Sequence, residues 1–378
     1  MNSIQEKTFS RLSTKLYGLD HLRAFAITFV FVFHYGHLFP SPQWITAIGK
    51  FGWTGVDLFF VLSGYLISSQ LFATIAKGKN ISLKEFFLKR FFRIVPDYLL
   101  IVAIYFCIPA ARERGTPAPL WKFLTFTQNL GLNLPTQGAF SHAWSLCIEE
   151  QFYLLLPLIL VALVYFKAIK KGFLLLIVLF ILGLAVRWYT YTYIVAPVLE
   201  DDGGWIYWYK WIYYPPWCRL DGLITGVGIA ALFQFRPSLK ERITKYGNLL
   251  LLLSIIMLAG AYYVCIEEQS FEASVFGFPL VSIGYGLLVM GAISPSSFLY
   301  KFKSGTASTI ATFSYAIYLS HKIIIHFIQV QFSKLSITID SNLLFLICII
   351  ACLAGAWLMN RIIEKPVLKL RNKILSEE

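Results

Sequence analysis

Side chains suited to chemistry are concentrated in the stretch SHAWSLCIEEQFYLLLP at residues 141–157. A histidine, two serines, two adjacent carboxylates and a glutamine lead there directly into a strongly apolar run. Burying an ionisable side chain in a membrane helix is costly, and such residues usually face a cavity in which they have a function. This stretch is therefore the first candidate for an active site.

Three residues of this stretch, His142, Ser145 and Glu149, are spaced so that they form one stripe along a helix. Because a helix rises about 1.5 Å per residue, Glu149 lies about 10 Å deeper than His142. Which of the adjacent carboxylates, Glu149 or Glu150, faces the site depends on the rotation of the helix. The stripe favours Glu149.

A second histidine, His34, lies in the first apolar segment, eleven residues after Arg23. Eleven residues make three helical turns to within about 20°, so both side chains share one face, with His34 roughly 16 Å above Arg23. Asp20, three residues before Arg23, is placed to pair with it. In a hydrocarbon core about 30 Å thick, His34 and Glu149 reach similar depths from opposite sides. We therefore expect an imidazole and a carboxylate to meet there as general base and orienting partner.

Two further segments place charged residues in or beside apolar runs. Asp57 lies near the start of the second run, and PPWCRLDGLITG at 215–226 brings Arg219 and Asp221 within reach of each other. A buried structural ion pair and a substrate contact both explain the Arg219–Asp221 pair. The sequence leaves these two readings open.

Arg90 and Arg93 lie in the segment LKRFFRIVP, at the end of the loop expected at 75–93. Their spacing of three residues places them on one side of a helix start. Forked guanidinium donors suit phosphate oxygens, so a phosphate-bearing ligand is one prediction. Lipid head groups at the membrane surface are the alternative.

The composition indicates a single membrane bundle. Hydrophobic residues make up 57% of the chain, charged residues 14%, and the mean hydropathy is +0.66. The apolar stretches are long enough for helices to cross a core of about 30 Å, and too long and uniform for barrel strands. We predict an all-α membrane protein with about ten transmembrane helices. The spans are expected at residues 24–39, 54–74, 94–110, 142–166, 172–192, 217–235, 247–266, 274–293, 310–332 and 343–363.

The distribution of charge sets the expected orientation. The chain holds 33 Lys and Arg residues against 20 Asp and Glu residues, a formal net charge of +13. Most of the basic residues lie before the first span, in alternate loops and after the last span. The positive-inside rule therefore places both termini in the cytoplasm. This arrangement explains the basic balance with membrane lipid as the partner and without nucleic acid.

The sequence predicts no metal site, because the spacing of histidines and carboxylates fits no common metal motif. The six cysteines lie mostly inside the expected spans and form no CxxC pair, which is typical of packing residues. The aromatic segment WIYWYKWIYYPPW at 205–217 indicates a belt at the outer membrane interface. Sugar stacking is the alternative role for this segment.

These segments, in this order, resemble the acyltransferase-3 family of integral-membrane O-acyltransferases. GLDHLRA followed by His34 is similar to the family's Arg-x10-His signature, and GVDLFFVLSGYLIS to its second-helix motif. RFFRIVP is similar to its Arg-x-x-Arg motif, and FSHAWSLCIEEQFYLLLP to its Ser-His-x-Trp-Ser…Glu-Glu-Gln-Phe motif. CRLDGLITG, FSYAIYLSHKII and RIIEKPVLKL resemble its later landmarks. The likeness covers nearly the whole chain.

The resemblance implies a ten-helix bundle, in the bacterial plasma membrane, that transfers an acyl group to a hydroxyl. The donor is then an acyl-CoA, usually acetyl-CoA, and the acceptor a cell-envelope carbohydrate such as O-antigen or exopolysaccharide. Arg23 and His34 become the central catalytic pair, and Arg90 and Arg93 bind the phosphates of coenzyme A. The residues implied to line the reaction chamber are His142, Trp144, Glu149 and Glu150. Weaker candidates for substrate binding are Trp144, Ser145, Asp57, Arg219, Asp221 and His321.

Two departures from the family pattern bear on the reaction. Lys322, Ile323 and Ile324 follow His321, where many relatives have an aromatic residue and a proline, so His321 is a weaker candidate. Some longer relatives add a secreted esterase-like domain, whereas this sequence stops at Glu378. We therefore expect one acyltransferase domain over residues 1–378, with transfer finished by that domain or by a separate envelope protein.

Two other functions stay open. A buried set of His, Glu and Arg in a helical bundle also describes a transporter of polysaccharide or acyl groups with a proton relay. Alternating access is often built from inverted repeats, and none is evident here. The other alternative is an acyltransferase that acts on a small molecule such as a macrolide. For the enzyme, His34 either removes the hydroxyl proton or first takes the acyl group itself.

Overall fold

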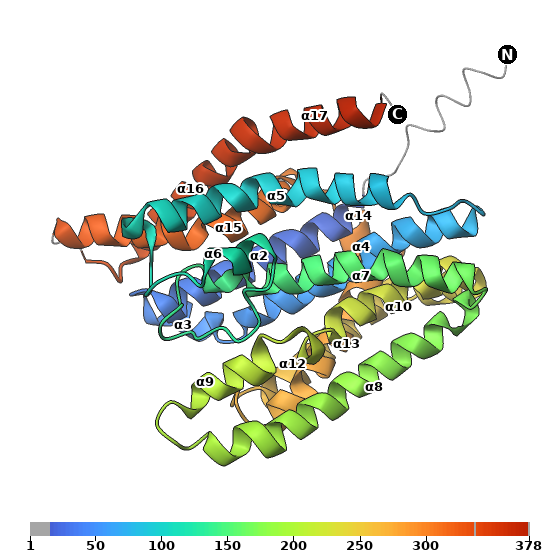
Figure 1. Cartoon of the computed structure of the whole chain (residues 1–378), viewed down its shortest axis with the longest axis horizontal. Helices are drawn as coiled ribbons and strands as arrows, with labels where there is room; N and C mark the ends of the chain where they lie inside the picture. Colours follow the sequence, from blue (N-terminus) through green and yellow to red (C-terminus); the bar gives the residue numbers. More distant parts are fainter. Residues whose placement is uncertain (1–15, 336–337, 377–378) are drawn as a thin grey trace.

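The computed structural model of the chain describes residues 16–335 and 338–376. That part of the chain is helical, and its only β-type pairing is an isolated bridge between Pro117 and Ala139. The predicted all-α fold is therefore confirmed for these residues. The long helices run side by side along the length of the molecule (Figure 1).

Helices of very different length make up the bundle. The helices that carry the predicted spans are α2 (Tyr17–Leu38), α4 (Gly55–Ala76), α5 (Leu83–Cys107), α7 (Trp144–Tyr165), α8 (Gly172–Thr190), α10 (Asp221–Phe235), α12 (Gly247–Val264), α13 (Phe278–Ala292), α15 (Gly305–Lys334) and α16 (Asn342–Met359). Shorter helices are α3 (Gln43–Gly49), α6 (Leu120–Leu124), α9 (Gly204–Trp208), α11 (Pro237–Thr244), α14 (Phe298–Lys301) and α17 (Lys365–Ser376).

Single turns of other helix types interrupt or extend these helices. The π-helical segments are η5 (Tyr191–Val195), η7 (Tyr209–Tyr213), η9 (Ala273–Gly277) and η10 (Asn360–Glu364). The 3-10 turns are η1 (Gly52–Thr54), η2 (Pro109–Ala111), η3 (Ser141–Ala143), η4 (Ile169–Lys171), η6 (Ala196–Val198) and η8 (Pro216–Cys218).

Within the described residues, 6 helices are long and apolar enough to cross a membrane. They are Gly52–Ala76, Ser141–Tyr165, Ile169–Val198, Gly247–Val264, Ala273–Ala292 and Asn342–Ser376. α10 is apolar but shorter, and α2, α5 and α15 are long but carry more polar side chains. The count of ten spans and the cytoplasmic position of the termini therefore stay predictions.

Two helices begin well before the expected spans. α2 begins at Tyr17, so that Asp20 and Arg23 lie inside the helix. α5 begins at Leu83, where Ser82 Oγ caps it by accepting a hydrogen bond from the Glu85 backbone N–H at 3.2 Å. Hydropathy marks where a helix enters an apolar environment, not where it starts. Arg90 and Arg93 are therefore carried on a helix rather than on the predicted loop 75–93.

Glycines set the close packing at the centre of the bundle. A Cβ atom on Gly64 of α4 would lie 2.2 Å from the carbonyl oxygen of Leu223 in α10, and one on Gly226 would lie 2.2 Å from that of Val61. Only glycine permits such an approach of two helix backbones. α2 packs between α4 and α15, and α15 also contacts α16.

The bundle has a middle layer and two flanks (Figure 1). α2, α4 and α7 lie in the middle, α5, α15, α16 and α17 on one flank, and α8, α12 and α13 on the other. The end at which α2 begins is the one that the charge distribution predicts to face the cytoplasm, and it is here named the inner end. The opposite end, where α7 begins, is named the outer end.

Candidate active site

Three histidines from three separate segments meet in the interior. His34 of α2 places its Nδ1 atom 2.8 Å from Nε2 of His321 in α15, and the two rings stack with centroids 5.0 Å apart. The ring of His142, in η3 at the start of α7, lies 5.7 Å from His34 and 5.2 Å from His321. We name these residues the three-histidine cluster.

The hydrogen bonds of His321 fix the proton positions in the His34–His321 pair. His321 Nδ1 lies 2.9 Å from the carbonyl oxygens of Ile317 and Tyr318, which can only accept, so this nitrogen carries a proton. In the neutral ring, His321 Nε2 then accepts a hydrogen bond from the Nδ1–H of His34. His34 Nε2 keeps its lone pair, and no group in the described part of the chain hydrogen-bonds it. A general base requires such an atom.

His142 is held by the helix that carries His321. Its Nε2 donates to the carbonyl oxygen of Tyr318 at 3.1 Å, while the Tyr318 hydroxyl donates to the carbonyl oxygen of His142. Ser145 Oγ lies 2.6 Å from the same hydroxyl. Phe140, just before this turn, has a left-handed φ of 55°, which a residue with a side chain rarely adopts. His142 thus sits at the end of a strained, tightly bonded turn.

The expected pairing of His34 with Glu149 is wrong. Glu149 Oε1 accepts a hydrogen bond from Ser63 Oγ of α4 at 2.9 Å, and Oε2 accepts one from the Tyr153 hydroxyl at 3.4 Å. His321 occupies the place beside His34 instead. The expected match in depth is also wrong, because His142 at the start of α7 lies beside His34, and Glu149 follows seven residues, or about 10 Å, further along that helix.

A second set of ionisable residues lies toward the inner end. The charges of Arg23 and Arg90 both act on Glu149, and that of Arg90 also acts on Glu150. The Arg90 guanidinium lies over the Tyr153 ring at 5.5 Å from its centroid. Arg23, Arg90, Glu149 and Glu150 thus form one group of charged residues on the inner side of the three-histidine cluster. We name these four residues the inner charged set.

Arg93 has a protein partner that the sequence did not reveal. It forms an ion pair with Glu364 of η10, whose side chain is 4% exposed and also accepts a hydrogen bond from Asn360 Nδ2 at 2.7 Å. The segment RIIEKPVLKL therefore contributes directly to this end of the site. Asp20, proposed as the partner of Arg23, accepts a hydrogen bond from Ser308 Oγ of α15 at 2.8 Å.

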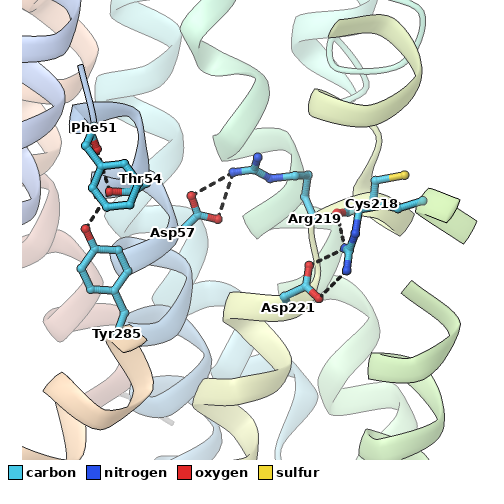
Figure 2. Close-up of polar contacts among 8 residues, drawn as sticks. Phe51, Thr54, Asp57, Cys218, Arg219, Asp221 and Tyr285 are labelled. Carbon is cyan, nitrogen blue, oxygen red and sulfur yellow. Dashed lines mark hydrogen bonds and ion pairs between the residues drawn. The ribbon is translucent and has the colours of Figure 1, made fainter. Parts of the chain in front are cut away.

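The predicted Arg219–Asp221 pair is replaced by two longer-range pairs. Arg219, directly after η8, donates from Nη2 to both oxygens of Asp57 in α4 at 2.9 and 3.0 Å (Figure 2). Asp221 instead accepts from Arg187 of α8 at 2.6 and 3.0 Å. Arg187 also donates to the carbonyl oxygen of Cys218 at 2.8 Å. Arg219 and Asp221, two residues apart at the start of a helix, therefore pair with different helices. Their closeness in the sequence does not predict this.

A further buried ion pair borders the three-histidine cluster. Lys322 Nζ lies 3.0 Å from Glu113, and the two side chains are 4% and 3% exposed. Glu113 belongs to the segment between α5 and α7, which we name the outer loop. The sequence did not point to Glu113, and Lys322 stood out only as a departure from the family pattern. The usable signal was an ionisable residue inside an apolar helix, directly after a candidate histidine.

The comparisons with known proteins identify the family of the chain. The acyltransferase domain of the acyltransferase-3 family matches residues 16–361. The O-acetyltransferase OatA of Staphylococcus aureus strain NCTC 8325 / PS 47 is 28% identical over 390 residues, which cover 96% of this chain and 60% of that protein. The peptidoglycan O-acetyltransferase OatA of Listeria monocytogenes strain EGD-e is 31% identical over 375 residues, which cover 93% and 56%.

This chain thus spans less than two thirds of the length of these two relatives. No solved structure matches the chain at a significant level. The family match nevertheless extends from the start of α2 to η10 and includes all three histidines and the inner charged set. The chain therefore belongs to the acyltransferase-3 family of integral proteins of the bacterial membrane.

Proposed function

We propose that this protein is a membrane O-acyltransferase that moves an acetyl group from acetyl-CoA at the inner end to a carbohydrate hydroxyl at the outer end. The observation that carries the proposal is the His34–His321 hydrogen bond, because it leaves His34 Nε2 with a free lone pair. The names of the two relatives support acetyl as the group, and that of the Listeria protein supports peptidoglycan as the acceptor.

His34 acts as the base in this scheme. Its Nε2 takes the proton of the acceptor hydroxyl while the hydroxyl oxygen forms a bond to the carbonyl carbon of the thioester. The carbon–sulfur bond then breaks, and the leaving thiolate takes the proton from His34, which restores the neutral ring. In the alternative route, His34 Nε2 attacks the thioester carbonyl carbon, the carbon–sulfur bond breaks and the thiolate leaves. The acceptor hydroxyl oxygen then takes the acyl group from Nε2, and its proton goes to the thiolate.

The inner charged set is suited to a phosphate-bearing donor. Arg23 and Arg90 offer two guanidinium groups near the inner end, and such groups bind phosphate oxygens through paired donors. Arg93 joins them when a phosphate replaces the Glu364 carboxylate as its partner. His34 lies roughly 16 Å above Arg23 on the same helix, so the donor must be extended, as coenzyme A is.

The proposal includes a topology. Ten spans with both termini in the cytoplasm place Arg23 and Arg90 on the side where acyl-CoA is made, and the three-histidine cluster nearer the envelope. The membrane domain completes the transfer itself or hands the acyl group to a separate envelope protein. The plasma membrane is the location that suits both substrates.

The test is acyl transfer by purified protein in lipid, with radiolabelled acetyl-CoA and soluble glycan fragments. We expect wild type to label the glycan and His34→Gln to lose at least about 100-fold in rate, as for loss of a general base. His37→Gln is the matched control, because His37 lies on the same helix and is exposed.

Other outcomes separate the alternatives. Label on a macrolide but not on glycan would assign the protein to small-molecule acylation. Absence of transfer and of thioester cleavage in wild type, together with glycan flux across the vesicle membrane, would contradict the proposal and favour a transporter. Arg90→Ala should raise the KM for acetyl-CoA more than it lowers kcat, because it removes a binding group rather than the base.

A further inference from the structure

Aromatic rings form a continuous ladder from the outer end toward the three-histidine cluster. Trp205 contacts Tyr209 with ring centroids 5.9 Å apart, and Tyr209 contacts Tyr214 at 5.5 Å. Tyr214 contacts Trp144 at 5.6 Å. Trp144 follows His142 by two residues and precedes Ser145, so the inner end of the ladder adjoins the candidate active site. Tyr213 lies beside this path, 5.3 Å from Tyr209 and 4.9 Å from Trp144.

Polar groups of this ladder have no protein partner. Among the described residues, no group hydrogen-bonds the hydroxyls of Tyr209, Tyr213 or Tyr214, or the indole N–H of Trp144. Tyr213, Tyr214 and Trp144 are nevertheless only 9%, 3% and 5% exposed. None of these four polar atoms is among the fully buried atoms that lack a partner, so each keeps some access from outside the protein. Four accessible polar atoms along one row of largely buried rings therefore offer hydrogen bonds to a polar ligand.

The hydroxyls remain donors at neutral pH. Burial raises the pKa of Tyr209 to about 12, and it raises the pKa of Tyr213 and Tyr214 well above the usual value. Each hydroxyl thus keeps its proton and offers both a donor and an acceptor.

The local backbone supports a binding role. π-helical turns are rare in proteins and, where they occur, often lie at functional sites. At this end η5 contacts η7, and η9 contacts α8. Tyr209 and Tyr213 belong to η7, and Trp208 beside them donates from Nε1 to Ser274 Oγ of η9 at 2.8 Å. The π turns therefore fix the angle at which the ladder rings are presented.

A buried cation, Arg219, contacts two rings of the ladder. The Arg219 guanidinium lies 4.7 Å from the centroid of Tyr213 and 5.3 Å from that of Trp144, and Asp57 holds it in place (Figure 2). A cation over an aromatic face is stabilising, more so away from water. This assigns Asp57 and Arg219 to positioning the rings.

We propose that Tyr209, Tyr213, Tyr214 and Trp144 form the binding site for the acceptor, and that the acceptor is a carbohydrate. Sugar rings present C–H groups on their faces and hydroxyls at their rim. The partly exposed rings of Trp205 and Tyr209 suit the sugar faces, and the accessible polar edges of the more deeply buried rings suit the hydroxyls. In this proposal the acceptor enters at Tyr209, which is partly exposed. Its reacting hydroxyl then lies toward Ser145 and the three-histidine cluster. The assignment of this ligand as an acceptor rests on the proposed function.

The test uses substitutions that remove a hydroxyl and keep the ring. We expect Tyr209→Phe, Tyr213→Phe and Tyr214→Phe each to weaken binding of a soluble N-acetylglucosamine tetrasaccharide by about two- to tenfold, the effect of one hydrogen bond. Binding is followed by tryptophan fluorescence in the absence of donor. Tyr207→Phe is the matched control, since Tyr207 lies in the same segment, is 46% exposed and has no place in the ladder.

Binding and transfer separate this inference from the proposed function. In transfer assays the same variants should raise the KM for the glycan by the same factor and change kcat less. Glycan binding that depends on these hydroxyls, with no acyl transfer by wild type, would support the ladder and contradict the transferase. Three Phe variants with wild-type affinity would overturn the ladder, as would binding of a macrolide in place of the tetrasaccharide.

Discussion

At the scale of single residues, the hydrogen bond between His34 and His321 determines which nitrogen of His34 can act as a base. His321 has its Nδ1 proton directed at two backbone carbonyl oxygens, so its Nε2 accepts from His34. This fixes the tautomer of His34 and leaves Nε2 as the reactive atom. Because His321 acts through His34, it is a positioning residue.

Removing the acceptor at position 321 should therefore disable the base. We expect His321→Leu to lower kcat about 100-fold or more and to shift the pH dependence of the rate. His321→Gln, whose amide oxygen can accept from His34 Nδ1–H, should restore at least a tenth of the wild-type rate. The measurement is kcat over a range of pH with acetyl-CoA and glycan.

The two variants also provide the control for this prediction. Leu and Gln remove the same imidazole but differ in their capacity to accept a hydrogen bond. Equal losses in both variants, with an unchanged pH profile, would mean that His321 serves packing only and would contradict the tautomer assignment.

The sequence predicted which residues belong to the candidate site better than it predicted their partners. His34 and His142 were found from residue type and spacing, and both belong to the three-histidine cluster. Glu149 was assigned to His34, yet it bonds to Ser63 and Tyr153. Helical periodicity predicts which residues share a face of one helix. The partners of those residues depend on the packing of α7 against α4 and of α2 against α15.

Close contact between α4 and α10 governs the bundle at the scale of elements. This contact brings Asp57 of α4 to Arg219, which lies between η8 and α10, and holds Ser63 beside Glu149. It exists because Gly64 and Gly226 leave room for backbone atoms of the facing helix. The glycines therefore help to position the site without touching it.

Adding one methyl group at this contact should force the two helices apart. We expect Gly64→Ala to destabilise the protein by about 1–3 kcal/mol, as overpacking does, because the new Cβ would lie 2.2 Å from the Leu223 carbonyl oxygen. Gly228→Ala on α10 is the control, since a Cβ there meets nothing within 4 Å.

Thermal unfolding in detergent measures both variants. The control should be neutral or stabilising by up to about 1 kcal/mol, since alanine is the better helix former. A Gly64→Ala variant as stable as Gly228→Ala would show that the helices do not approach this closely.

Periodicity and hydropathy predicted the existence of the elements but not all of their limits. Each predicted span coincides with a helix, yet α2 and α5 begin earlier than expected. Polar helical turns outside the apolar core carry no hydropathy signal. The Ser82 cap was the available local signal for α5.

The whole molecule divides the proposed reaction between its two ends. The inner charged set lies near the predicted cytoplasmic face, and the aromatic ladder lies near the opposite face, with the three-histidine cluster between them. Long-range ion pairs such as Arg187–Asp221 and Lys322–Glu113 tie the flanks and the outer loop to this core. Such pairs depend on the tertiary arrangement and could not be predicted from one sequence.

The outer end should respond to pH through Glu268, which lies in the loop between α12 and η9. Burial raises the pKa of Glu268 from 4.5 to about 7. The folded state thus holds this proton more tightly than the unfolded state. Its stabilisation is complete below about pH 4.5 and is lost as the pH rises through 7, by at most about 3 kcal/mol.

Glu268→Gln should remove this dependence, because the amide stays neutral. We expect wild type to lose thermal stability between pH 5 and 8 relative to Glu268→Gln, while the two agree more closely at low pH. Glu267→Gln, at the exposed neighbouring position, should keep the wild-type trend. Identical pH profiles for wild type and Glu268→Gln would contradict the burial of this carboxyl group.

The measurement that tests the central claim most directly is acyl transfer across a sealed vesicle membrane. Radiolabelled acetyl-CoA is supplied at the inner end of the protein, and a soluble glycan is enclosed on the other side. We predict label on the enclosed glycan with wild type and none above background with His34→Gln. Equal labelling by His34→Gln and wild type, or glycan that leaves the vesicle without being labelled, would contradict the account.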